Sequence, residues 1–180
     1  MDLRKLLLEV FFVLMACGLL EILAGFALSR MESLLESLPG LLIMVPPMMD
    51  LRGDINGSFA SRLGSGIHMG IIDFRSSDEI IENLKAVIFL SLAVPALIAL
   101  FSYSVCSIFG ISSMSFFNLL FIAVCTGIVS SMILSALSII VTYGTFVSGI
   151  DPDNVTIPVL ATIGDFITIS AMFAFAVVVA

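Results

Sequence analysis

The chain has 180 residues, of which 60% are apolar and 12% are charged, and its formal net charge is −7. Soluble globular domains contain about 45–50% apolar and about 25% charged residues, so this composition, laid out in long apolar runs, indicates an integral membrane protein. No basic cluster is present, which argues against nucleic-acid binding. The sequence also lacks the HExxH, GxSxG, P-loop and GxGxxG motifs, so we expect no enzymatic activity.

Five segments are expected to cross the lipid bilayer as helices, which makes residues 1–180 a single all-α membrane domain. A span needs about 20 apolar residues to cross about 30 Å of hydrocarbon, and four of the five segments meet this easily. We place the five spans at residues 6–29, 35–65, 84–109, 115–147 and 152–179.

The second span is expected to be broken. Its apolar run, LLIMVPPMM, stops at Asp50 and is followed by LRGDINGSFASRLGSGIHMG, which is rich in Gly, Ser and charged residues. Irregular backbone at membrane depth is tolerated only where it is buried in protein or lines an aqueous cavity, and interrupted spans often mark transport sites. The alternative is that the chain simply leaves the membrane at Asp50.

The distribution of basic residues predicts the orientation of the chain. Positive residues favour the cytoplasmic side of a membrane. We therefore expect the N-terminus and the connector at residues 66–82 to be cytoplasmic, the C-terminus to be outside, and the protein to lie in the plasma membrane. Six of the seven Lys and Arg residues support this orientation: Arg4, Lys5, Arg52, Arg62, Arg75 and Lys85.

Asp165 is the most informative residue of the fifth span, because it lies about halfway along it. A carboxylate at that depth costs roughly 2.5–3.5 kcal/mol on insertion scales, and spans three to five offer no basic partner. A second carboxylate, water or a cation must therefore satisfy it, unless it is a protonated, structural Asp. Helical spacing places it on an oxygen-rich stripe with Asn154, Pro158, Ala161, Thr168 and Met172, of which Pro158 and Thr168 are candidates to line the pore. We add Thr162, beside this stripe, to the pore-lining candidates.

Polar residues on the first two spans add further candidates. Asp50, Asp54 and Asn56 cluster on the cytoplasmic side of the second span, although nearby Arg52 and Arg62 could neutralise them in surface ion pairs. We expect Asp50 and Gly53 to line the pore. Glu21 lies deep in the first span and is a candidate for coupling. On the fourth span we expect a stripe of small residues to serve helix packing rather than to line a pore: Gly127, Ser131, Ser135, Ser138 and Thr142.

Two stretches resemble signatures of the MgtE and solute carrier 41 families. PGLLIMVPPMMDLRGDINGSFASRLGSGIHMG is similar to their second-span signature, in which a proline-containing apolar run enters a Gly-Asn or Gly-Asp turn before A-S-R-L. DPDNVTIPVLATIGDFITIS resembles their fifth-span signature even more closely. The two motifs occur in the right order and spacing, and together they cover about 50 residues of the chain.

The resemblance implies a pathway for divalent cations, chiefly Mg²⁺, with Mn²⁺, Co²⁺ or Ca²⁺ as other candidates. It further implies a pore at a twofold interface, so we expect a homodimer or a heterodimer with a similar five-helix chain. The cytosolic sensor domains of bacterial MgtE have no counterpart in the sequence, so their gating is not carried over. By motif position, the metal-binding candidates are Asp165, the Ala161 carbonyl, Asp153 and Asn154 at the cytoplasmic mouth, and Asp54 and Asn56 on the second-span turn, where Asp54 replaces the more usual Asn.

Two other functions remain open at this point. In a sodium- or proton-coupled exchanger, Glu21 and Asp165 could relay protons. In a non-transporting membrane subunit, the chain would only scaffold a partner.

Overall fold

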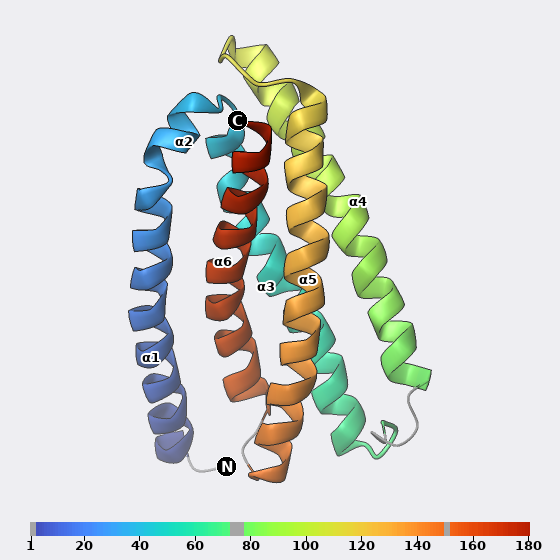
Figure 1. Cartoon of the computed structure of the whole chain (residues 1–180). Coiled ribbons are helices and arrows are strands. Elements are labelled where there is room, and N and C mark those ends of the chain that lie inside the picture. The colour runs from blue at the N-terminus through green and yellow to red at the C-terminus, as the bar shows by residue number, and fades with distance from the viewer. Residues whose placement is uncertain (1–2, 73–77, 150–151) are drawn as a thin grey trace.

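The computed structural model describes residues 3–72, 78–149 and 152–180. The described residues form five long helices and one short one, which confirms the all-helical architecture, and four of the long helices are apolar enough to span a membrane. The long helices run alternately up and down, so the N- and C-termini lie at opposite ends of the bundle (Figure 1). The helices are α1 (Leu3–Arg30), α2 (Glu32–Ser37), α3 (Leu41–His68), α4 (Asp78–Phe109), α5 (Phe116–Val147) and α6 (Pro152–Val179).

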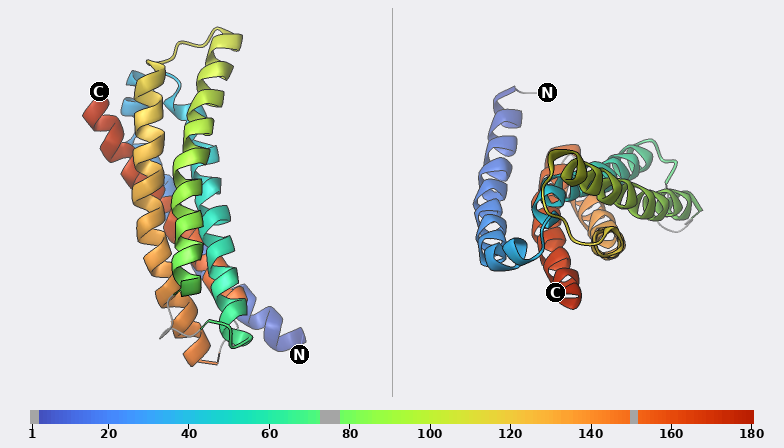
Figure 2. Two further views of the ribbon diagram at one scale, coloured as in Figure 1. Left: turned by 90° about the vertical axis from the view of Figure 1, so that its right-hand side faces the viewer. Right: turned by 90° about the horizontal axis from the view of Figure 1, so that it is seen from above.

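Helix α3 lies at the centre of the bundle and packs against α4, α5 and α6, whereas α1 packs mainly against α6. Seen from above, α1 stands to one side of the other helices (Figure 2). Glycines let α3 approach α6 closely. A Cβ atom on Gly53 would lie 4.0 Å from the Cβ of Ala161, and one on Gly57 would lie 3.8 Å from Ile157.

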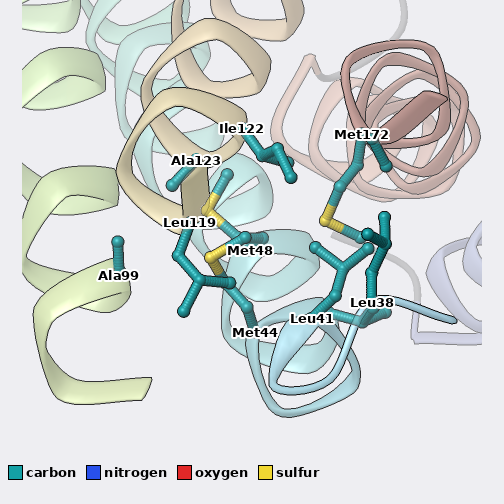
Figure 3. Close-up of a cluster of buried hydrophobic side chains, with 11 residues drawn as sticks. Leu38, Leu41, Met44, Met48, Ala99, Leu119, Ile122, Ala123 and Met172 are labelled. Carbon is teal, nitrogen blue, oxygen red and sulfur yellow. The ribbon is translucent and has the colours of Figure 1, made fainter. Parts of the chain in front are cut away.

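Apolar side chains fill both halves of the bundle. Near the C-terminal end of α6, Met44 and Met48 of α3 meet Leu119 of α5 and Met172 of α6, and all four are fully buried (Figure 3). A second cluster joins the later half of α3 to the first half of α4, and a small one joins α1 to α6. The helices therefore hold one another along most of their length.

The small-residue stripe on α5 packs as the sequence predicts. Gly127 is the tightest point, because a Cβ there would lie only 2.6 Å from the Ser91 carbonyl oxygen and from Pro95 of α4. Such close approach of helix backbones is the usual role of small residues in membrane proteins. All five members of the stripe are buried: Gly127, Ser131, Ser135, Ser138 and Thr142.

The break expected in the second span does not occur within the described residues. Helix α3 is continuous from Leu41 to His68, and it includes Pro46 and Pro47 as well as the whole DLRGDIN segment. The physical reason is that Arg52 and Asn56 of this segment bind polar groups of α5, so the backbone need not unwind to satisfy them. The expected connector is also shorter, because α4 begins at Asp78.

We predict that Gly127→Ala lowers the free energy of unfolding by about 1–3 kcal/mol, the usual penalty of overpacking, because the new methyl group meets backbone that cannot move aside. The matched control is Gly144→Ala on the same helix, where a Cβ meets nothing within 4 Å. Thermal or denaturant unfolding of the purified protein in detergent measures both. Equal stability of the two variants would show that α4 and α5 do not pack as described.

Candidate functional site

Three carboxylates from three helices gather near the middle of the bundle. Asp165 of α6 is half-buried, and Glu21 of α1 and Asp50 of α3 lie close enough for their negative charges to act on it. We call Glu21, Asp50 and Asp165 the carboxylate cluster. Sequence analysis singled out each of these residues, and the fold brings them together.

The packing of α6 against its two neighbours positions the carboxylate cluster. The close contact of Gly53 with Ala161 fixes α3 against α6, which places Asp50 on the side of α3 near Asp165. On the other side, the Thr162 hydroxyl lies 3.4 Å from a carboxylate oxygen of Glu21 and donates to the Pro158 carbonyl at 3.1 Å. Thr162 therefore links α1 to α6 at the level of the cluster.

The cluster carries an excess of negative charge. No ion pair joins its three carboxylates to a basic side chain in the described part of the chain. Like charges this close disfavour joint ionisation, and a cation between them removes the conflict. Within residues 3–72, 78–149 and 152–180, however, no three His, Cys, Asp or Glu side chains are close enough to ligate one metal ion directly.

Asn56, a candidate metal ligand, faces a different neighbour. It is fully buried, and its side-chain nitrogen lies 3.3 Å from the Arg52 carbonyl oxygen. The hydroxyl of Ser135 on α5 donates to its side-chain oxygen at 3.3 Å. The structure thus places Asn56 in the contact between α3 and α5 and not beside the carboxylate cluster.

Arg52 is also buried in this contact, which corrects the alternative of a surface ion pair. Its guanidinium donates to the Gly127 carbonyl oxygen at 2.8 Å and to the Ser131 hydroxyl, which also accepts a hydrogen bond from the Ser91 hydroxyl of α4 at 2.6 Å. We call Arg52, Ser91, Gly127 and Ser131 the arginine network. The sequence contained a signal for it, because the small-residue stripe of α5 supplies the hydroxyl and the carbonyl.

Asp54 lies apart from the carboxylate cluster. It is exposed and lines a groove of about 250 Å³ between α3 and α4 together with Arg62 and Asn83. Arg62 donates to the side-chain oxygen of Asn83 at 3.3 Å and makes no ion pair with Asp54. The role predicted for Asp54 in metal binding stays a prediction.

The other candidates lie along α6. Asp153 and Asn154 are in its first turn. Pro158 and Ala161 are partly buried, whereas Thr168 is fully buried and its hydroxyl has no hydrogen-bond partner in the described part of the protein. Thr168 therefore faces the packed interior of this chain.

Four long helices that are apolar enough to span a membrane indicate a multi-pass membrane protein. The profile of the MgtE family, described as a divalent cation transporter, matches residues 45–175. The chain therefore belongs to the MgtE family.

Curated relatives support this membership. Solute carrier family 41 member 3 of Rattus norvegicus is 30% identical over 174 residues, which cover 91% of this chain and 37% of the relative. Its counterpart in Mus musculus is 33% identical over 140 residues, which cover 73% of this chain and 28% of the relative. Solute carrier family 41 member 2 of Gallus gallus is 25% identical over 185 residues, covering 92% and 30%. The chain thus spans about a third of the length of these relatives.

We predict that the pair Gly53→Cys and Ala161→Cys forms a disulfide on mild oxidation, because the two Cβ atoms would lie 4.0 Å apart, within the usual range of about 3.5–4.5 Å. The background is a chain in which Cys17, Cys106 and Cys125 are replaced by Ala; all three are free thiols. Mass spectrometry of the digested protein measures the bond. The control pair is Gly144→Cys with Ala161→Cys, and equal yields from both pairs would contradict the described contact of α3 with α6.

Proposed function

We propose that this chain forms a pathway for divalent cations, chiefly Mg²⁺, across the plasma membrane, and that the carboxylate cluster is its cation-binding site. One observation carries the proposal: Asp165 is half-buried at mid-length of α6, beside Glu21 and Asp50 and with no basic partner among the described residues. Membership in a family of divalent cation transporters supports the same chemistry.

The proposed ion keeps part of its hydration shell. Mg²⁺ gives up its water reluctantly and is commonly held by one or two carboxylates while it keeps several water molecules. Mn²⁺, Co²⁺ and Ca²⁺ are then expected to compete with Mg²⁺ for the cluster.

We further propose that the complete pathway needs two five-helix units, either two copies of this chain or this chain and a similar one. Asp50 and Glu21 are exposed in the single chain, so the cluster is open on one side. A second unit related by twofold symmetry would close it and supply further ligands. The start of α1 and the end of α3 lie at the same end of the bundle (Figure 1), which agrees with the expectation that both face the cytoplasm.

A proton- or sodium-coupled exchanger is the second candidate, favoured by the position of Glu21. This carboxylate reaches Asp165 from another helix, so one of the two could hold a proton while the other binds the ion. Flux that depends on an opposing proton or sodium gradient would identify the exchanger.

We predict that Asp165→Asn folds normally, with stability unchanged or higher, and that it lowers Mg²⁺ flux at least about tenfold, which corresponds to roughly 1.4 kcal/mol. The substitution keeps the shape but removes the charge that attracts the ion. Uptake into liposomes with a Mg²⁺ indicator measures the flux. Glu82→Gln, on the exposed surface of α4, removes a carboxylate far from the cluster and is the control. If Asp165→Asn conducts Mg²⁺ as well as the wild-type protein, Asp165 has a structural role only. If the unaltered protein conducts no Mg²⁺, the result favours a membrane subunit that scaffolds a partner.

A further inference from the structure

A pocket between α4 and α5 belongs to no part of the proposed pathway. Its volume is about 370 Å³, and it opens on the outer surface of the bundle, because Ile88, Met132 and Ala136 on its rim are exposed. The carboxylate cluster comes from α1, α3 and α6, whereas α4 stands on the side of the bundle away from α1 (Figure 2). A ligand would therefore enter this pocket sideways, from the lipid bilayer.

Three serines are the polar part of an otherwise apolar pocket. Ser91, Ser131 and Ser135 line it and are almost completely buried, so their hydroxyls lie at its floor and not on its rim. They occupy positions near the middle of α4 and α5, which places the floor near mid-depth of the membrane. At that depth the hydrogen bonds that remain open on the floor decide which ligand fits.

Ser131 has one hydrogen-bonding capacity left. A serine hydroxyl has one O–H donor and two acceptor lone pairs. The Ser131 oxygen accepts from Nη1 of Arg52 and from the Ser91 hydroxyl, which uses both lone pairs, and its own O–H donates to no acceptor in the described part of the chain. Ser131 can therefore offer a ligand only a donor, so the polar group that it recognises is an acceptor.

A buried positive charge stands directly behind Ser131. Arg52 is fully buried, its Nε and Nη2 atoms have no partner among the described residues, and no ion pair there compensates its charge. Burying a charge without an opposite one is strongly unfavourable. An acceptor bound to Ser131 would lie two hydrogen bonds from the guanidinium, roughly 5 Å. The acceptor that these surroundings favour most is thus an anion.

We propose that this pocket binds a single-chain amphiphile from the bilayer, whose carboxylate accepts a hydrogen bond from Ser131 and whose hydrocarbon chain lies along the apolar wall. This wall includes Leu84, Val87, Ile128 and Ile139. An engineered cavity of about 150 Å³ holds benzene, so by proportion this pocket suits about 15 non-hydrogen atoms, the size of a medium-chain fatty acid such as decanoate. The site goes beyond the proposed function and does not depend on it.

The competing occupant is the acyl chain of an ordinary phospholipid. Such a chain would match the apolar wall, but it offers no acceptor to Ser131 and no negative charge to Arg52. An alcohol is intermediate, because it accepts the hydrogen bond without a charge. Decanoate, decanol and decane therefore separate the contributions of charge, hydrogen bonding and apolar contact.

The test is photo-crosslinking of the full chain, in phosphatidylcholine nanodiscs, with decanoic acid that carries a diazirine in its chain. At about pH 8 a carboxylic acid is largely ionised. We expect labelled peptides from residues 84–91 of α4 and 128–139 of α5. Unlabelled decanoate should prevent the labelling at least about tenfold more effectively than decanol, because opposite charges at roughly 5 Å attract strongly where water screens them weakly. Decane should compete least.

Three variants link the labelling to the pocket and to the charge. Ala136→Phe fills the mouth of the pocket and should abolish the labelling, whereas Ile140→Phe, at an exposed position of α5 outside the pocket, should leave it unchanged. Arg52→Gln removes the charge but keeps a hydrogen-bonding side chain, so decanoate should lose its advantage over decanol. If Arg52→Gln does not fold, the two phenylalanine variants and the three competitors still decide.

Two kinds of result would overturn the proposal. Labelling spread over the exposed faces of all helices, or labelling that Ala136→Phe does not reduce, would show that the pocket holds only ordinary bilayer chains. Equal competition by decanol and decanoate, or an advantage of decanoate that Arg52→Gln leaves intact, would show that the pocket does not select a carboxylate.

Discussion

The close approach of α3 to α6 is the contact on which both polar groups of this protein depend. Gly53 and Gly57 on one helix, and Ala161 and Gly164 on the other, leave little side-chain volume between the two backbones. One side of the contact then holds the carboxylate cluster, and the other side holds the arginine network. Larger residues here would separate Asp50 from Asp165 and would withdraw Arg52 from α5. In a bilayer, where apolar surface drives helix association only weakly, such small-residue contacts decide which helices meet.

The hydrocarbon surroundings explain why these polar residues cannot be incidental. A charge inside a membrane protein is stable only if neighbouring groups compensate it, and in this chain the compensation is divided between helices. Neutral oxygens of α5 bind Arg52 in part, and in the proposed function a cation relieves the repulsion within the carboxylate cluster. The proposed transport function thus follows from one condition, the neutralisation of charge at mid-depth.

Much of this fold could be predicted from the sequence, because membrane helices depend on local properties. The length of the apolar runs predicts α1, α4, α5 and α6, and the helical spacing of small residues predicts the buried stripe of α5. The continuity of α3 could not be predicted. Its polar residues indicate a break in the helix unless the residues of α5 that bind them are known. Asn56 and Arg52 face α5 only because that helix packs there. Likewise, the depth of Glu21 was evident, but its position beside Asp165 depends on how α1 docks on α6.

The location of a bound divalent ion tests the central claim most directly. A trifluoromethyl label on Phe166→Cys reports from the residue beside Asp165, and the same label on Phe109→Cys reports from the end of α4; both positions are exposed. In the cysteine-free background, paramagnetic Mn²⁺ should broaden the fluorine NMR signal at position 166 strongly and that at position 109 little, and excess Mg²⁺ should reverse the broadening. Equal broadening at both positions, or broadening at 109 alone, would contradict a cation site at the carboxylate cluster.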